Sequence, residues 1–174
     1  MTLDELAALP VQRLAHPEGC ALLVWTTGPK LLDTKVLLDA WGFRYVTIAF
    51  VWVKRNKDSS RGGLTGTMGY YTRPNIEPVL LGIRRKAPPI LSHSVEQVID
   101  GYFPHLWDED FEPPFELDDP IVAVRRAHSR KPDEQYDRIE RLFAGPYLEM
   151  FARGPHSHSW DSWGNQAEEK EIAA

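Results

Sequence analysis

The apolar positions of the chain form short continuous runs that alternate with stretches of helical period. The continuous run at 21–25 is typical of a buried strand, and further strands are expected at 46–53, 79–83 and 147–151. Between them, apolar residues recur at helical spacing in 32–40, before Gly42, and in 136–143. Strands that alternate with helices predict an α/β sheet.

Capping and turn residues set the expected element boundaries. Thr2 and Glu5 form a capping-box pattern that opens a short helix ended by Pro10, and a second box at 94–97 predicts another short helix. Pro132 suits the first position of a helix, which the Gly-Pro step at 145–146 should end. A short edge strand is expected at 121–124.

Two stretches interrupt the alternation. Residues 54–75 are rich in glycine and polar side chains, and so long a loop in a compact domain is usually functional or disordered. Residues 100–120 are rich in acidic residues and proline, which indicates a solvated surface insertion. We therefore expect one domain over 1–166, with this insertion, followed by a tail at 167–174.

Composition narrows the classes of protein that fit. The 174 residues are 43% hydrophobic, which is enough for one domain with a core, and the net charge is −5. Cys20 is the only cysteine, so no internal disulfide and no cysteine-based zinc site can form. No stretch is long and apolar enough to span a bilayer, and the N-terminus lacks the pattern of a signal peptide. These features favour a cytoplasmic location for the protein.

The loop after the last expected strand carries the candidate chemistry. Ligands of open α/β sheets bind beyond the carboxyl ends of strands, which places Arg153, His156, Ser157 and Asn165 where a small molecule would bind. His156 and His158, without a nearby cysteine, are too weak a pattern to indicate a metal, so no metal site is expected.

Five stretches resemble one family. His-Ser-Arg-Lys-Pro-Asp-Glu at 128–134, Glu-Met-Phe-Ala-Arg at 149–153 and the Trp…Gly-Asn-Gln close at 160–166 occur in the family's order. Residues 22–27 and 51–54 match as well. The chain thus resembles the MT-A70 family, S-adenosylmethionine-dependent N6-adenine methyltransferases whose bacterial and phage members act on DNA and whose eukaryotic members act on messenger RNA.

The resemblance implies a fold and a methyl donor. The fold would be a Rossmann-like methyltransferase sheet with helices on both faces. By resemblance, S-adenosylmethionine is the cofactor, and its contacts would be Lys131, Arg153, His156, Ser157, Asn165 and Gln166. Lys131 and Arg153 could neutralise the donor's carboxylate. The side-chain amides of Asn165 and Gln166 could bind the ribose hydroxyls. Ser157 stands where a family member can carry Asn.

The resemblance also implies an acceptor side. It places the end of the second strand, Trp52 and Lys54, beside the target base, as catalytic candidates. Segment 54–86 holds eight basic residues and two tyrosines but only two acids, a composition that suits nucleic-acid contact. The candidates for DNA or RNA contact are Arg55, Lys57, Arg61, Tyr70, Asn75 and Glu77.

One motif of the family is absent from this sequence. The family's Asp-Pro-Pro-Trp motif grips the adenine amine and lies N-terminal to a Leu-Pro-Val run, here at 9–11. The Glu-Pro-Pro-Phe at 112–115 lies in the acidic insertion and is rejected as a substitute. The expected sheet therefore lacks one N-terminal strand. Three hypotheses follow: an enzyme whose catalytic strand comes from a partner subunit or a longer gene product, a non-catalytic subunit that binds nucleic acid or scaffolds a partner, and an inactive remnant.

Overall fold

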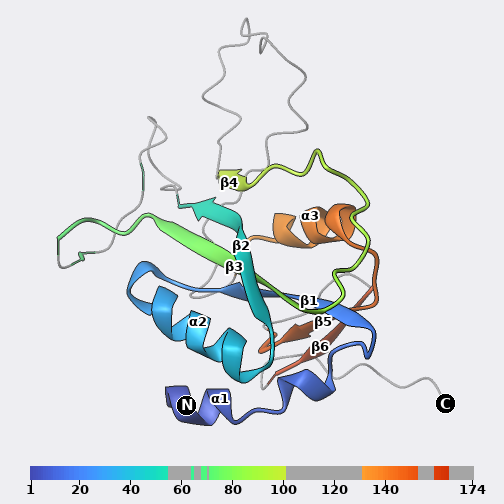
Figure 1. Cartoon of the computed structure of the whole chain (residues 1–174). Coiled ribbons are helices and arrows are strands. Elements are labelled where there is room, and N and C mark those ends of the chain that lie inside the picture. The colour runs from blue at the N-terminus through green and yellow to red at the C-terminus, as the bar shows by residue number, and fades with distance from the viewer. Residues whose placement is uncertain (55–63, 65–67, 70, 101–130, 153–158, 165–174) are drawn as a thin grey trace, which may run out of the picture.

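A computed structural model describes residues 1–54, 64, 68–69, 71–100, 131–152 and 159–164. Four strands form one mixed sheet in the order β1-β3-β2-β4 (Figure 1). They are β1 (Gly19–Trp25), β2 (Arg44–Val53), β3 (Ile76–Arg85) and β4 (Val98–Asp100). β3 runs antiparallel to both β1 and β2, and β4 runs parallel to β2. The α/β prediction is confirmed at this level.

Helices cover both faces of this sheet. On one face, α1 (Leu3–Ala7), the 3-10 turn η1 (Val11–Arg13) and α2 (Leu31–Ala40) gather around the fully buried Leu38, and a second 3-10 turn, η2 (Gly28–Lys30), leads into α2. On the other face, Tyr136 and Ile139 of α3 (Glu134–Leu142) pack against Phe50 and Val79. The alternation of side chains along β2 and β3 supplies both cores, as expected for a sheet that is buried on two sides.

Two further strands form a separate parallel pair, β5 (Tyr147–Met150) with β6 (Trp160–Trp163). Tyr147 stacks on Trp160 with ring centroids 4.9 Å apart, and Tyr136 of α3 meets the same indole edge-on. These aromatic contacts tie the pair to the α3 face of the molecule. β5 was expected from the sequence, whereas β4 and β6 were not.

Several expectations about the elements need correction. The capping-box pattern at 94–97 does not open a helix, because the Ser94 hydroxyl pairs with Ser92 and the chain enters β4. In α2 the buried side chains are Thr34, Leu37 and Leu38, and not the whole apolar face. Leu32 and Val36 are exposed, because the helix is covered on one side only. α3 begins two residues after Pro132, at Glu134. The strand expected at 121–124 lies outside the described residues.

β1 also differs from the expected buried strand. All seven of its residues are only partly buried, whereas most of β3 is buried. β1 pairs with β3 along one edge, and no described strand pairs with its other edge. No helix among the described residues is long and apolar enough to cross a membrane.

Candidate functional site

The candidate site lies at one edge of the main sheet. β1 and β2 are parallel to each other because each is antiparallel to β3, so their carboxyl ends share this edge. The register places Trp25 opposite Val79 and Trp52 opposite Glu77. The backbone N–H of Lys54 donates to the Asn75 carbonyl at 2.8 Å and closes the strand ends together. The segment that leads into α3 brings Lys131 to the same edge.

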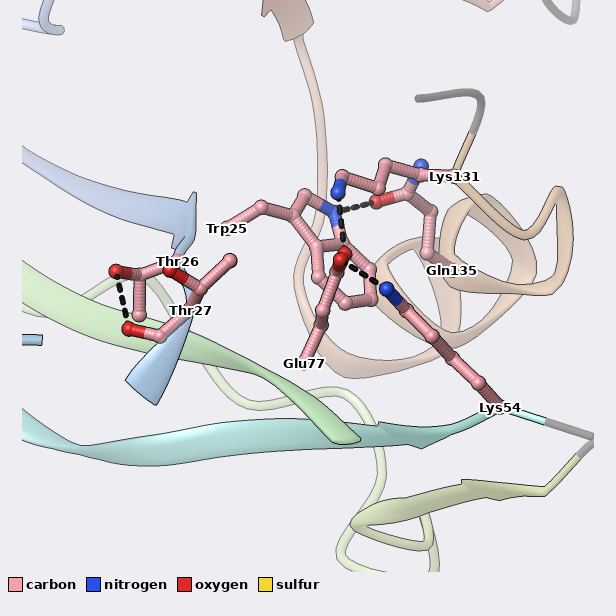
Figure 2. A network of polar contacts seen from close by, with 7 residues as sticks. All are labelled: Trp25, Thr26, Thr27, Lys54, Glu77, Lys131 and Gln135. Carbon is pink, nitrogen blue, oxygen red and sulfur yellow. Dashed lines mark hydrogen bonds and ion pairs between the residues drawn. The ribbon is translucent and has the colours of Figure 1, made fainter. Parts of the chain in front are cut away.

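A shared carboxylate is the centre of this site. The Lys131 Nζ donates to Glu77 Oε2 at 2.5 Å, and the Lys54 Nζ donates to Glu77 Oε1 (Figure 2). Two ammonium groups and one carboxylate leave one net positive charge. Both lysine side chains keep about a quarter of their surface exposed, at 27%, so they can still reach a ligand while they hold Glu77.

Two tryptophans wall the carboxylate and its lysines. The Lys131 Nζ lies 5.2 Å from the ring centroid of Trp25, and the Lys54 Nζ lies 5.3 Å from that of Trp52. Both distances fall within the range of cation–π attraction. The two indoles meet edge-on at 6.2 Å. The Trp25 Nε1–H donates to Gln135 Oε1 of α3 at 2.5 Å, so the helix fixes this ring.

The indole N–H of Trp52 differs from that of Trp25. It is buried, and no acceptor for it is found in the part of the chain that the structure describes. A buried donor without an acceptor costs about 1 to 3 kcal/mol. The Trp52 indole N–H is therefore a donor without an acceptor among the described residues, and it lies beside the partly exposed Lys54.

Burial and the lysines act in opposite directions on Glu77. Burial alone would raise the pKa of its carboxyl. The hydrogen bonds from Lys131 and Lys54, with their charges, outweigh burial and hold the pKa below its ordinary value. Glu77 is therefore ionised at neutral pH and keeps both lysines in place.

The structure thus brings together residues that sequence reasoning had assigned to three separate roles. Trp52 and Lys54 were catalytic candidates, Lys131 a donor contact and Glu77 a nucleic-acid contact, and all four meet at one edge. Asn75 joins them through its backbone carbonyl, which accepts from the Lys54 N–H. Trp25 and Gln135 were missed. Gln135 lies in the first turn of α3, four residues after Lys131, and this proximity in the sequence was the signal that could have found it.

The remaining predicted contacts lie outside the described residues. These are Arg153, His156, Ser157, Asn165 and Gln166 on the donor side, and Arg55, Lys57, Arg61 and Tyr70 on the nucleic-acid side. Their roles stay predictions. The described ends of β5 and β6 lead directly into the two donor-side segments.

Comparison with known proteins agrees with the motifs at this edge. The MT-A70 family model matches residues 1–166. The chain belongs to the MT-A70 family. A type II methyltransferase of a Mycoplasma species, M.MunI, is 30% identical over 174 residues, which cover 99% of this chain and 60% of that protein. The resemblance seen in the sequence is thereby confirmed.

Eukaryotic members are similar to the same stretch. The N(6)-adenosine-methyltransferase MT-A70-like protein of Arabidopsis thaliana is 32% identical over 94% of this chain, and the human N(6)-adenosine-methyltransferase catalytic subunit METTL3 is 32% identical over 95%. These matches cover only 20% and 24% of the two relatives. This chain therefore spans 60% or less of the relatives described here, which contain further polypeptide.

Proposed function

We propose that this chain forms the donor-binding and nucleic-acid-contacting part of an adenine N6-methyltransferase that acts on DNA, or in second place on RNA. The observation that carries the proposal is the Lys54–Glu77–Lys131 cluster at the carboxyl edge of the sheet. It joins a lysine expected beside the base to a lysine expected at the donor. The family membership supports methyl transfer as the reaction, and the eukaryotic relatives, which are N(6)-adenosine-methyltransferases, support adenosine as the acceptor.

The residues present fit S-adenosylmethionine in their chemistry. When bound, the donor supplies an electrophilic methyl group on a sulfonium, beside a carboxylate and an adenosine. Lys131 offers a partly exposed ammonium for the carboxylate, and its bond to Glu77 fixes where that charge lies. Lys54 lies on the opposite side of the same carboxylate, where it can contact the phosphate or base of a nucleotide. Asn165 and Gln166 would bind the ribose.

The acceptor side of the site has no counterpart of the family's amine-binding motif in this sequence. Methylation of the adenine amine requires hydrogen-bond acceptors that favour the developing charge on N6, and the printed sequence contains no Asp-Pro-Pro-Trp to provide them. Glu77 is engaged by two lysines and is a poor replacement. We therefore infer that this polypeptide alone binds the donor but transfers no methyl group, because equal binding of ground and transition states lowers no barrier.

Calorimetry with S-adenosylhomocysteine tests the donor half. We expect weak binding, reduced about tenfold by Lys131→Ala, which removes the ammonium, and by Asn165→Ala. Lys35→Ala is the matched control, because Lys35 forms an exposed ion pair with Asp39 within α2. A folded chain that gives no heat and no thermal shift at millimolar ligand contradicts donor binding.

A labelled-methyl assay on DNA and on RNA tests the acceptor half. No turnover is expected from the chain alone, and turnover is expected once an Asp-Pro-Pro-Trp strand is supplied. Loss of a single preorganised contact of this kind costs about a hundredfold to a thousandfold in rate. Clear turnover by the unmodified chain would show that another residue grips the base. If the chain binds the donor but transfers no methyl group with or without the added strand, the result would favour a non-catalytic subunit.

A further inference from the structure

The first turn of α3 reaches the carboxyl end of β1 through a buried side chain. Gln135 is 6% exposed, and its Oε1 accepts the indole N–H of Trp25 at 2.5 Å (Figure 2). The Gln135 backbone N–H donates to the carbonyl of Pro132, the residue after Lys131, at 3.3 Å. One tight turn therefore carries both Gln135, which binds the N–H of Trp25, and Lys131, which lies over the Trp25 ring.

Two kinds of contact hold the Trp25 indole. A hydrogen bond along the indole N–H lies in the plane of the ring, whereas a cation is attracted to the face of the ring. The bond to Gln135 therefore fixes the direction of Nε1, and with it the direction in which the ring face points. Trp52 meets the same ring edge-on at 6.2 Å and limits its movement further. The indole is thus a fixed surface against which the Lys131 ammonium lies.

The position of the Lys131 ammonium depends on this surface. Its Nζ donates to Glu77 Oε2 at 2.5 Å and lies 5.2 Å from the Trp25 ring centroid. An ammonium carries three donors, so it can hold Glu77 and still bind an oxygen of a ligand. A lysine side chain has several rotatable bonds, and fixing it when a ligand binds costs free energy unless the protein has already fixed it. A Trp25 ring held by Gln135 supplies part of that preorganisation.

We propose that Gln135 is a positioning residue for the methyl donor: through the Trp25 indole it holds the Lys131 ammonium where the donor's carboxylate binds. This inference deepens the proposed function and rests on it for the identity of the ligand. Gln135 itself touches no ligand in this arrangement, because its side chain is buried and its oxygen is engaged by Trp25. Its effect on donor binding should therefore be confined to the part of the donor that Lys131 meets.

Two ligands separate positioning from general damage to the site. S-adenosylhomocysteine carries the amino-acid carboxylate, whereas 5′-methylthioadenosine has the same adenosine and thioether but lacks the amino-acid arm. We expect Gln135→Leu to weaken binding of S-adenosylhomocysteine about fivefold and binding of methylthioadenosine less than about twofold, measured by calorimetry. On a Lys131→Ala background, Gln135→Leu should cause no further loss, since the ammonium that it positions is gone.

Tyr147→Phe is the matched control. The Tyr147 hydroxyl donates to the Phe143 carbonyl at 2.6 Å, at the opposite end of α3 from Lys131, so this variant also removes one hydrogen bond at a helix end. It should leave the ratio of the two affinities unchanged.

A second variant covers the case in which Gln135→Leu alone does not fold. Trp25→Phe combined with Gln135→Leu removes the indole N–H together with its acceptor, and such paired removal is far less costly than leaving a buried donor unsatisfied. The combined variant keeps an aromatic ring beside Lys131 but no bond that fixes it. It should lose affinity for S-adenosylhomocysteine and keep its affinity for methylthioadenosine.

Competitive labelling of lysines with acetic anhydride reports on Lys131 without any donor. An ammonium held between Glu77 and an indole is shielded from the reagent, so Gln135→Leu should increase labelling of Lys131 about threefold. Lys35, which forms an exposed pair with Asp39 on α2, is the internal reference and should be labelled equally in both proteins.

The results separate this inference from the proposed function. Equal loss of both ligands, or a loss that persists without Lys131, overturns the inference in favour of a structural role or a direct contact for Gln135. Unchanged labelling of Lys131 also overturns it. If the folded wild-type chain binds neither ligand, the proposed function fails, and labelling alone decides whether Gln135 positions Lys131.

Discussion

At the scale of single residues, Glu77 organises the site because it satisfies two cations that sequence reasoning had kept apart. Its position opposite Trp52 in the β2–β3 ladder is what brings Lys54 and Lys131 within reach of one carboxylate. No sequence pattern shows this, since Glu77 lies 23 residues from Lys54 and 54 from Lys131. The sequence identified these three residues as site candidates, but it did not show that both lysines bind the same carboxylate.

Replacement of Glu77 by Gln should make stability less dependent on acid pH. The folded pKa of Glu77 lies below its ordinary value of 4.5, so its stabilising effect is complete above about pH 4.5 and is lost as pH falls through the folded pKa. At pH 7 we expect the variant to unfold with about 2 kcal/mol less free energy. The two curves should converge only as pH falls below the folded pKa, which lies below 4.5. Urea unfolding across pH 3 to 7 measures this.

Asp39→Asn is the matched control, because Asp39 forms an exposed pair with Lys35 on α2. Exposed pairs contribute about 0 to 1 kcal/mol, so this variant should follow the wild-type curve closely. A Glu77→Gln curve that remains parallel to wild type at every pH would show that the lysines do not depend on this carboxylate.

The two site tryptophans offer a second comparison at this scale. Trp25→Phe removes a donor and leaves buried Gln135 without its partner, whereas Trp52→Phe removes an N–H that has no acceptor in the described residues. Both changes lose similar volume. We therefore expect Trp25→Phe to destabilise the chain by about 1 to 3 kcal/mol more than Trp52→Phe, measured by thermal unfolding. Equal losses would mean that the bond to Gln135 contributes little.

At the scale of elements, Gly82 shows how closely α2 approaches the sheet. A Cβ at Gly82 in β3 would lie 2.9 Å from Leu38 Cδ2 and 3.0 Å from Phe43 Cβ. Leu38 is fully buried, so a shift of its side chain would disturb the residues packed around it. Gly82→Ala should therefore cost about 1 to 3 kcal/mol through overpacking. Gly28→Ala is the matched control, since nothing lies within 4 Å of its Cβ, and chemical denaturation compares the two. A Gly82→Ala midpoint equal to the control would show that α2 can shift.

The hydrophobic pattern predicted where the helices and strands lie better than it predicted which strands pair with each other. The apolar runs located β1, β2, β3 and β5, and the Thr2 capping box located α1. The box at 94–97 failed because Ser92 offered Ser94 a nearer partner. β4 has only three residues, and the two central residues of β6, Asp161 and Ser162, are polar, so neither strand stands out by hydrophobicity. Antiparallel β3 and half-buried β1 depend on sheet order, which no local pattern encodes.

At the scale of the whole molecule, charge is separated along the chain. The acidic insertion carries much of the negative charge, and segment 54–86 carries eight cations in a chain of net charge −5. Such separation allows an acidic protein to present one basic surface to a polyanion. The family membership makes nucleic acid the expected polyanion.

Binding to duplex DNA should therefore be weak and should fall steeply with salt. Combined substitution of Arg55, Lys57 and Arg61 by Glu should abolish it, because contacts to phosphate release counterions in proportion to their number. Reversal of Arg13, Lys30 and Lys35, all outside this segment, is the matched control and should change binding little. Fluorescence anisotropy at several salt concentrations measures both. Binding that ignores salt, or that survives the first set of changes, would assign the contact to another surface.

The shared carboxylate has a thermodynamic consequence. A ligand that draws the Lys131 ammonium away from Glu77 leaves the carboxylate to Lys54 alone, so the two lysines cannot respond independently. By linkage, any change that donor binding makes in affinity for nucleic acid must be matched by an equal factor in the reverse direction. Replacement of Glu77 would then leave each affinity measurable while the two cease to affect one another. The Glu77 carboxylate would thus couple the binding of the methyl donor to the binding of nucleic acid.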